Sequence, residues 1–528
     1  MPPALDTATS FWKIRPSSIM LAMLVVATSI FIYLPSAQNT FVWDAQVFIA
    51  DNPSIRGLDK LSSIFTEPSS LPNEYQGEAI SFLPYYRPFN KAFQILTFSA
   101  FGDQPLGYKV VNMLLHGGVC LLVWLLFVSV TKNRSLSTLA ALLYAVKPVH
   151  VEAVAWSYSA SYLLTAFFAL LALLLYRHGP RWLALIGFAS ALMFNELGVL
   201  LLPVLFLHRW LLEGKYRPAE FIALLPYVAI TLGFITLRSA VVGAVPLTEV
   251  DPITFMHTSA VVLQKYLKIF FWPDAPVTIY LAKTYSQLSA EVVLSYFVLL
   301  GVASLSIVLW FRDRIGLFWL LWFLVWIAVS FNIGRFNDYL MAEKLAYIAA
   351  IGPSMLLVHW LNRALKGKLP LTAVIVISLV ILQGFNTWTR LPHWQNTQTY
   401  LTEGLNFAPD FYNGHYSLAQ TYINSGNYDQ AQQHLEKSIE LKPGFSLALN
   451  NLANIHFLKR NHGRAIDYWQ QALRNDPSNP QPYFNIGMTL QQQGRISEAR
   501  AYYQRYLTLE PNPQPAVINV IAPLMRQR

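Results

Sequence analysis

The stretch SLALNNLANIHFLKRNHGRAIDYWQQALRNDPSN (residues 446–479) decides the fold of the carboxy-terminal part of the chain, because the sequence on either side repeats its pattern. Proline recurs every 34 residues around it, at the steps 443 − 409, 477 − 443 and 511 − 477. Small residues keep the same period, at Ala431, Ala465 and Ala499. A small residue where two helices cross and a proline after the second helix predict a helix pair that stacks on copies of itself.

This period is the tetratricopeptide-repeat signature. We expect three repeats, at about 412–445, 446–479 and 480–513, which stack into an α-solenoid. The sequence WQNTQTYLTEGLNFAP (394–409) resembles a preceding half repeat.

Two asparagines of the repeats are candidates for binding a peptide. Asn451 and Asn485 occupy the same repeat position, since 485 − 451 = 34. Each amide offers donors and an acceptor, so the pair resembles a ladder that grips an extended peptide backbone. The alternative is that asparagine is merely tolerated at this position and solvated.

The rest of the chain has the composition of a membrane protein. Of the 528 residues, 54% are hydrophobic and only 12% are charged, against about 25% charged in soluble domains. The mean hydropathy is +0.38. Runs long enough to cross a bilayer, or slightly shorter where helices break, predict about eleven spans. They lie near residues 17–36, 107–130, 136–149, 159–176, 182–195, 197–212, 219–237, 288–311, 315–331, 344–361 and 370–386.

Basic residues set the orientation of these spans. Six Lys/Arg clusters lie in short links, and with the amino terminus inside, every cluster falls on the inner side. We therefore expect an all-α protein with a polytopic membrane domain at 1–389 and an extracytoplasmic repeat domain at 390–528. The net charge of +10 then reflects topology, and a nucleic-acid partner is not expected.

The compartment follows from indirect signals. The lone Cys120 excludes an internal disulfide. The single Asn-x-Ser/Thr triplet, at 133–135, falls in a predicted inner loop. The repeats therefore carry no N-glycan acceptor, which favours a bacterial inner membrane with periplasmic repeats. In a eukaryote the expected place is the endoplasmic-reticulum membrane, with the repeats in the lumen.

Ionisable residues gather on the predicted outer side. Asp44 lies at the mouth of the first span, where a carboxylate is costly, and other polar groups share that side: Arg87, Lys147, His150, Glu152, Glu196, Arg238 and Lys344. Ionisable residues at membrane depth cost free energy, so we treat each of them as a candidate functional residue. Structural alternatives remain open: Asp44 as a helix cap, Lys344 as an ion-pair partner and Arg238 as an interfacial anchor.

Several motifs, in this order, resemble one family. They are WDAQVFIADNPSIRGL (43–58), YYRPF (85–89), GYKVVNMLLH (107–116), KPVHVEAVAW (147–156), AEKLAYIAAIG (342–352) and WTRLPHWQNTQTY (388–400). Followed by repeats, they resemble the transmembrane and tetratricopeptide-repeat O-mannosyltransferase family and its bacterial relatives, which are similar to GT-C membrane glycosyltransferases. The resemblance covers essentially the whole chain.

The resemblance implies an inverting glycosyltransferase. A polyprenyl-phosphate sugar is the implied donor and a Ser or Thr hydroxyl of a protein is the implied acceptor, presented by the repeats through Asn451 and Asn485. By position, Asp44 would be the base, which suits a poor alcohol nucleophile. The other outer residues would bind the sugar and the lipid phosphate, with Arg238, Lys344 and His150 as the first candidates for the phosphate.

Three departures from the family pattern weaken the case for catalysis. Ala45 replaces a second loop acid, Lys147 replaces a histidine, and SYSASY (157–162) replaces a segment with Arg and Asp. The alternative function is a degenerate membrane scaffold whose repeats recruit envelope or glycan-assembly partners. A third, weaker option is a ligase that joins lipid-linked glycan to another glycan or lipid. No cofactor is expected: Asp44, Glu152 and Glu196 could surround a hard cation, but their spacing does not require one.

Overall fold

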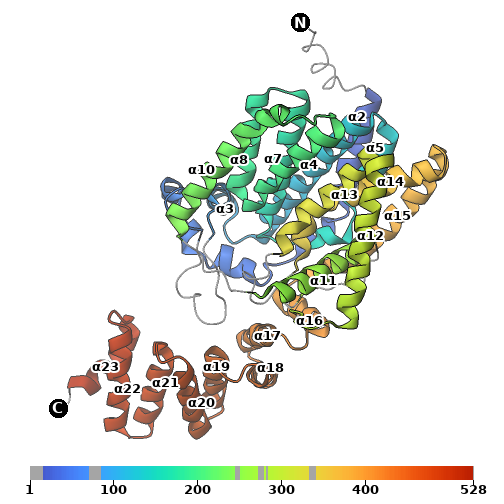
Figure 1. The fold of residues 1–528 in the computed structure, drawn as a ribbon. Helices are drawn as coiled ribbons and strands as arrows, with labels where there is room; N and C mark the ends of the chain where they lie inside the picture. Colours follow the sequence, from blue (N-terminus) through green and yellow to red (C-terminus); the bar gives the residue numbers. More distant parts are fainter. Residues whose placement is uncertain are drawn as a thin grey trace. The chain divides into compact units, whose positions relative to one another are not determined.

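The computed structural model describes residues 16–69, 85–243, 250–271, 279–280, 283–331 and 341–526. The chain divides into two compact units, one made of residues 1–72 and 83–400, the other of residues 73–82 and 401–528. Helices make up the described parts of both units, where the one β feature is an isolated bridge between Ser69 and Tyr85. The predicted all-α class is confirmed (Figure 1).

Six helices of the first unit are long and apolar enough to cross a membrane, counted over the described residues. They are α4 (Pro105–Thr131), α7 (Ala160–His178), η9 with α10 (Pro218–Leu224 and Leu225–Val242), α12 (Ala290–Arg312), α13 with η10 (Arg314–Ile327 and Ala328–Phe331) and α15 with η12 (Leu369–Arg390 and Leu391–Trp394). A seventh candidate is α5 (Arg134–Ala145) followed by η6 (Pro148–His150) and α6 (Val151–Ala155), bent by 55°.

The other predicted runs form shorter helices. The runs 182–195 and 197–212 become α8 (Arg181–Phe194), η7 (Glu196–Leu200), α9 (Leu201–Leu207) and η8 (His208–Leu212). The first and tenth runs become α2 (Pro16–Phe31) and α14 (Ile351–Ala364). Hydropathy detects apolar length but not a break in the backbone, so some predicted runs are divided among several short helices.

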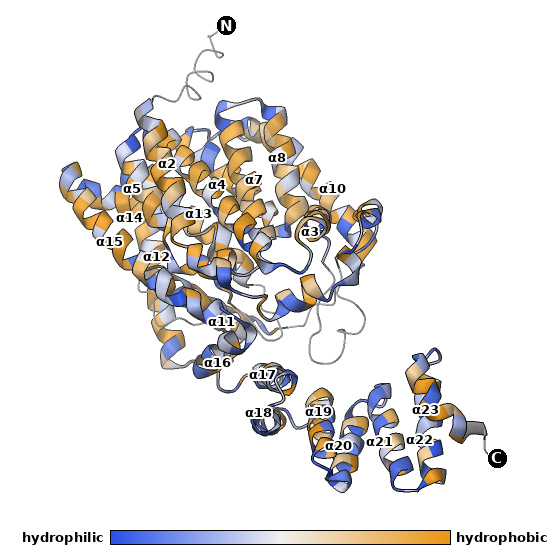
Figure 2. Ribbon diagram, turned by 180° about the vertical axis from the view of Figure 1, so that it is seen from behind, coloured by the Kyte–Doolittle hydropathy of each residue, from blue (hydrophilic) through white to orange (hydrophobic). Residues whose placement is uncertain are grey.

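Burial separates the membrane helices into two groups. Most of α4 and α7 is buried, and these helices pack on each other and, through α7, on α8. In contrast, α12 carries exposed apolar side chains: the exposed fractions of Phe297, Leu300 and Phe311 are 67%, 64% and 80%. Exposed apolar area on this scale would cost much free energy in water, so these side chains indicate a lipid-facing surface. Hydrophobic residues run along the helices of this unit in Figure 2.

Between the long helices of the first unit the chain forms several shorter elements. After α2 the chain forms η1 (Leu34–Gln38), η2 (Gln46–Ala50), η3 (Pro53–Ile55) and η4 (Leu58–Ser63), then α3 (Pro88–Phe101). A second set lies between spans, with α11 (Pro252–Phe271) and η11 (Glu343–Ala346). These segments carry Asp44 and Lys344, and Arg87 directly precedes α3.

The second unit is a solenoid of helix pairs. The pairs are α17 (Tyr412–Asn424) with α18 (Tyr428–Leu441), α19 (Ser446–Leu458) with α20 (His462–Asn475), and α21 (Pro480–Gln492) with α22 (Ile496–Leu509). Each pair falls within one predicted repeat. Two further helices flank them, α16 (Thr397–Phe407), which begins in the first unit, and α23 (Pro515–Arg526).

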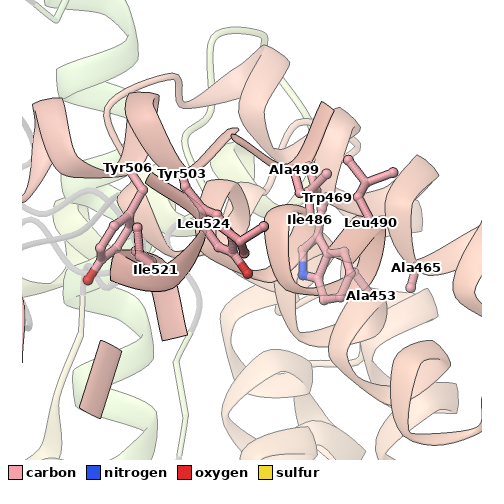
Figure 3. Close-up of a cluster of buried hydrophobic side chains, with 10 residues drawn as sticks. All are labelled: Ala453, Ala465, Trp469, Ile486, Leu490, Ala499, Tyr503, Tyr506, Ile521 and Leu524. Carbon is pink, nitrogen blue, oxygen red and sulfur yellow. The ribbon is translucent and has the colours of Figure 1, made fainter. Parts of the chain in front are cut away.

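Small residues at the helix crossings explain the repeat period. Ala453, Ala465 and Ala499 are fully buried beside Trp469 in one core cluster (Figure 3). At Gly487 an added Cβ would lie 2.7 Å from the ring of Tyr503. A larger residue there would force the two helices of the third repeat apart, because protein cores are close-packed.

Candidate functional site

Asp44 lies at the start of the helical run that continues into η2, and it is partly buried. Removal from water raises the pKa of its carboxyl to about 6. The charge of Lys344 works against this rise, and the charge of Glu152 adds to it. Both partners are therefore close enough to Asp44 to act on it, although they lie at least 108 positions away along the chain (152 − 44).

The residue before Asp44 has an unusual backbone conformation. Trp43 has a φ of 48°, in the left-handed region that bulky residues rarely adopt. Its backbone N–H donates to Oγ1 of Thr397 at 2.8 Å, and its ring lies 5.6 Å from the ring of Tyr400. The N–H of Thr40 donates to the Gln395 carbonyl at 2.9 Å. Residues 395–400 therefore hold the Asp44 loop, and the strain at Trp43 is offset by these contacts.

Glu152 and Lys344 form an ion pair near Asp44. The Lys344 Nζ lies 2.8 Å from Oε1 of Glu152, and its backbone N–H donates to Oε2 at 3.0 Å. The ammonium also lies over the Trp156 ring, 4.3 Å from its centroid. Burial by itself would lower the pKa of Lys344, but Glu152, with smaller contributions from Tyr162 and Asp44, raises it above the ordinary value.

A second ion pair joins Arg87 to Glu196. The guanidinium donates from Nε and Nη2 to the two carboxylate oxygens, both at 2.7 Å, in bidentate geometry. Burial opposes the charge on Glu196, but Arg87 outweighs it, and Arg238 adds to the effect, so the pKa of Glu196 is lowered. The guanidinium of Arg87 also lies 4.2 Å from the centroid of the Tyr85 ring.

Tyr85 links the two ion pairs. Burial raises the pKa of its phenol, and the charges of Arg87, Glu196 and Lys344 all act on it. Six of the candidates carry charges that act on one another or on Tyr85, and we call this set the Asp44 cluster: Asp44, Arg87, Glu152, Glu196, Arg238 and Lys344. With three carboxylates and three cations, the cluster is close to neutral. Its cationic side chains could bind a phosphate group.

Lys147 and His150 make different contacts. The Lys147 ammonium lies 3.5 Å from Oε1 of Gln383 and 5.7 Å from the centroid of the Phe270 ring. His150 is fully buried, with its ring 4.5 Å from that of Tyr144 and 4.7 Å from that of Tyr347. Residues 148–155 are helical, so side chains two positions apart diverge, and His150 turns into the aromatic core while Glu152 reaches Lys344.

The structure adds Tyr280 and Tyr400, and it gives contacts to Glu343 and Arg390, which the sequence places on the predicted outer side but outside the list of site candidates. Glu343 and Arg390 form a buried ion pair at 2.9 Å, and Tyr280 donates its hydroxyl to the same carboxylate oxygen at 2.9 Å. Burial raises the pKa of Glu343 more than Arg390 lowers it. Tyr400 is near enough to Asp44, Glu152 and Glu343 for their charges to raise the pKa of its phenol, although burial is the larger cause. The sequence did contain a signal for them: Glu343 directly precedes Lys344, and Arg390 and Tyr400 lie in the quoted motif at 388–400.

No group of three or more His, Cys, Asp or Glu side chains that could hold a metal ion is found among the described residues. In the Asp44 cluster two carboxylates already bind cationic side chains. The arrangement supplies a base of raised pKa, cationic donors and aromatic faces.

In the repeats, the two predicted asparagines are partly buried and each bonds to the preceding repeat. The Asn485 amide donates to Oδ1 of Asn454 at 3.1 Å, and that oxygen also accepts from the Trp469 indole at 3.1 Å. Asn451 hydrogen-bonds the hydroxyl of Tyr416. Both asparagines thus lie on first helices of repeats, α19 and α21, and contact the first helix of the repeat before.

Comparison with known proteins supports both units. A family model described as tetratricopeptide repeat matches residues 416–480 and 459–514. A protein O-mannosyl-transferase of Caenorhabditis elegans is 24% identical over 462 residues, which is 82% of this chain and 64% of that protein. The human protein O-mannosyl-transferases TMTC1 and TMTC4 are each 25% identical, over 82% and 80% of this chain and 56% and 67% of theirs.

The chain therefore spans between about half and two thirds of the length of these relatives. Among solved structures, one titled "Crystal structure of APC/C hetero-tetramer Cut9-Hcn1" covers 90% of this chain at 10% identity. Its TM-score of 0.25 is too low to support an argument.

Proposed function

We propose that this chain, which belongs with the transmembrane and tetratricopeptide-repeat O-mannosyltransferase-like proteins, moves a sugar from a polyprenyl-phosphate carrier to a Ser or Thr hydroxyl of a protein. The observation that carries the proposal is the Asp44 carboxyl, whose pKa is raised to about 6, next to the Lys344–Glu152 ion pair. The names of the relatives support protein O-glycosylation in general, and the lipid-phosphate donor is our inference from the chemistry of the cluster.

The proposed reaction is a single inverting displacement. The acceptor hydroxyl oxygen attacks the anomeric carbon of the sugar, its proton passes to the Asp44 carboxylate, and a new carbon–oxygen bond forms. The bond between the anomeric carbon and the phosphate oxygen breaks, and the lipid phosphate leaves with the electron pair. One base suffices for one displacement, so Ala45 at the position of a second acid does not prevent it.

Cations stabilise the leaving phosphate in this scheme. Lys344 uses one donor on Glu152 and has others for the phosphate, because an ammonium has three N–H groups. Arg87 uses two of its five N–H donors on Glu196, and three remain. Each carboxylate holds its cation in a fixed direction. The cations therefore need little rearrangement when negative charge develops on the leaving oxygen.

The proposal predicts the pH dependence of the reaction. The Asp44 carboxyl must be ionised to accept a proton, so kcat/KM should rise with pH and level off above about 6, the pKa that burial gives to this group. An Asp of ordinary pKa would place this limb near 3.8. The measurement is the rate of sugar transfer from a purified lipid-linked sugar between pH 4.5 and 8. A flat profile across this range contradicts the assignment of Asp44.

The hydrogen bond from the Trp43 N–H to Thr397, next to Asp44, gives a second prediction. Thr397→Val removes the acceptor for the Trp43 N–H at nearly constant volume, and one hydrogen bond is worth about 1 kcal/mol, or about fivefold in rate. We expect kcat to fall by about this factor and the acidic limb to move below pH 6, because a looser loop exposes Asp44 to water. Thr397→Ser keeps the acceptor and should restore both. An unchanged pH profile in Thr397→Val contradicts the prediction.

We further propose that the repeats present the acceptor protein. Asn451 and Asn485 retain donors and acceptors beyond the bonds they make to neighbouring helices, and the amides of Gln420 and Asn454 lie close by. In the proposed arrangement the membrane is the bacterial inner membrane, the amino terminus is cytoplasmic and the repeats are periplasmic. Membrane lipids surround the first unit.

Substitution of the two asparagines tests this role. The double variant Asn451→Ala/Asn485→Ala should raise KM for a protein acceptor by about 5- to 25-fold, the worth of one to two hydrogen bonds, and leave kcat unchanged. Asn475→Ala, at the exposed end of α20, is the matched control. The measurement is the initial rate against acceptor concentration. Equal KM values for the double variant and the control contradict the role.

A non-catalytic scaffold is the second candidate. It is favoured by residues 157–162, where Tyr158 stacks on Phe48 with ring centroids 4.2 Å apart and fills space with aromatic rather than ionic groups. Such a protein would keep the lipid-facing shell and recruit partners through its repeats. Turnover of a lipid-linked sugar by the purified protein decides between the two, because a scaffold gives none.

A further inference from the structure

A second polar site lies at the far end of α7 from the Asp44 cluster. Near the start of this helix, the ring centroid of Tyr162 lies 6.0 Å from the Lys344 ammonium. Arg177 lies 177 − 162 = 15 positions further along the helix, which is about 22 Å at about 1.5 Å per residue. The site is built from the ends of α4 and α7 and from η8, on the side of the membrane that the basic clusters predict to be the inner one.

Three hydrogen bonds hold Arg177 in this site. Its Nε donates to Oγ of Ser129 at 2.8 Å, its Nη2 donates to the carbonyl of the same residue at 3.3 Å, and its Nη1 donates to Nε2 of His208. A guanidinium has no acceptor, so this imidazole is neutral and its proton is on Nδ1, which lies 3.3 Å from Oε1 of Glu213. His208 therefore orients Arg177 without adding a charge, and two N–H groups of the guanidinium remain for a ligand.

Two further cations belong to the site. The side chain of Arg209 is only 9% exposed, and its Nη1 donates to the hydroxyl of Tyr176 at 2.6 Å, but its buried Nε has no hydrogen-bond partner among the described residues. Lys132 directly follows α4, and its charge and that of Arg177 act on one another. Within the described part of the chain, the one carboxylate at ion-pair distance from these three cations is Glu213, 3.7 Å from Nη1 of Arg209.

The charges of this site are unbalanced. Three cations face one carboxylate, which leaves an excess of 3 − 1 = 2 positive charges. Basic residues that only set the orientation of the spans can stay in water, as the exposed Arg217 and Lys368 do. A buried guanidinium with an unused donor is costly unless an anion accepts from it. A phosphate group suits the site, because its oxygens accept from several guanidinium and ammonium groups at once.

Aromatic side chains place the site at the level of the lipid head groups. Trp182, at the start of α8, and Tyr216, in the link after η8, are 62% and 58% exposed. The ring of Trp210, the residue after Arg209, lies 4.9 Å from that of Trp310. Trp and Tyr gather where a membrane meets water, and basic pockets between spanning helices on the inner side bind the head groups of anionic lipids.

We propose that Lys132, Arg177 and Arg209 bind a phosphate group at the inner surface of the membrane. The interfacial aromatic side chains favour the head group of an anionic phospholipid, and a soluble phosphate presents the same oxygens. Binding joins the ends of α4 and α7 to η8 and neutralises the excess charge. The site is separate from the Asp44 cluster, so the inference does not depend on sugar transfer.

Glutamine substitutions test the site. Arg177→Gln/Arg209→Gln removes two of its charges, and Arg217→Gln/Lys368→Gln is the matched control, because it removes two exposed charges from the same predicted side. Thermal unfolding of each full-length protein in a neutral detergent shows whether it folds. Arg209→Gln, which leaves every hydrogen bond of Arg177 in place, replaces the double variant if that protein does not fold, with Arg217→Gln as its control. Arg177→Lys/Arg209→Lys keeps the charges and should retain part of the binding.

The first arm of the experiment uses lipid as the probe. The full-length protein is placed in nanodiscs that contain phosphatidylglycerol and phosphatidylcholine in equal amounts, and native mass spectrometry measures which lipid stays bound. The wild type and the control should retain phosphatidylglycerol in preference. The glutamine variant should weaken this preference at least tenfold, the worth of one hydrogen bond to a charged group.

The second arm uses inorganic phosphate as the probe, added to the protein in neutral detergent, with chloride at the same ionic strength as the reference. A higher unfolding temperature of the wild type and the control, but not of the glutamine variant, assigns the site to a soluble phosphate. Preferential retention of phosphatidylglycerol without this effect assigns it to a lipid head group. Equal behaviour of the glutamine variant and the control in both arms overturns the proposal, as does a stabilisation that chloride reproduces while neither lipid is preferred.

Discussion

Asp44→Asn is expected to lower the rate of sugar transfer by about 10²- to 10⁴-fold, the usual contribution of a positioned general base. The amide has nearly the volume of the carboxyl but cannot take the proton of the acceptor hydroxyl. Binding of the lipid carrier should be retained, because Lys344 and Arg87 keep their carboxylate partners in the variant. The measurement is transfer of sugar from a purified lipid-linked donor to a Ser/Thr-containing acceptor protein.

A neighbouring carboxylate on the same loop provides the control. Asp51 is exposed and pairs with the Gln46 amide at 3.2 Å, so Asp51→Asn removes an equal charge seven positions away without touching the cluster. We expect wild-type transfer from Asp51→Asn. If Asp44→Asn transfers sugar as fast as this control, Asp44 is not the base.

The same substitution changes stability in a defined direction. The folded-state pKa of about 6 exceeds the ordinary value of 3.8, so the folded protein binds the proton more tightly than the unfolded chain, and the stability contributed by protonation is lost as pH rises through 6. Asp44→Asn, which cannot ionise, is therefore expected to unfold at a higher temperature than the wild type above pH 6, and this advantage should disappear below pH 4.

Lys344→Met is expected to have the second largest effect. Loss of a donor at the site of developing charge should reduce kcat/KM by about 10²- to 10³-fold. The variant also leaves Glu152 without its cation, and an unpaired buried carboxylate destabilises the fold. Thermal unfolding should therefore accompany the kinetic measurement.

The double variant Lys344→Met/Glu152→Gln separates these two effects. It removes both charges together, so the unfolding temperature should return toward that of the wild type while transfer stays low. Wild-type transfer by the double variant would show that Lys344 has only a structural role. Lys344→Arg keeps the charge and should retain part of the activity, because a guanidinium still donates to phosphate but with different geometry.

The fold could be predicted because its signals are local and repeated. The 34-residue period places small residues such as Ala453 and Gly487 at helix crossings, where the structure shows side chains packed against them. Hydropathy likewise identifies the membrane unit. It does not locate breaks in the backbone, because an apolar run remains apolar where a helix is interrupted, as at Glu196 between α8 and α9.

The candidate site could be predicted only in part. Asp44, Glu152 and Lys344 were selected from their residue types and their predicted side of the membrane, and the structure brings them together. Sequence spacing could not tell that the turn at 148–155 directs His150 into the aromatic core. Nor could it predict the bond from Trp43 to Thr397, because 354 positions separate the two residues and a single hydrogen bond leaves no pattern in the sequence.

Electron cryomicroscopy of the full-length protein with a bound polyprenyl phosphate tests the central claim most directly. The account predicts phosphate density within hydrogen-bonding distance of the Lys344 ammonium, on the side that faces the Asp44 carboxyl. Phosphate density beside a different set of cations, with Asp44 turned into open solvent, would contradict it.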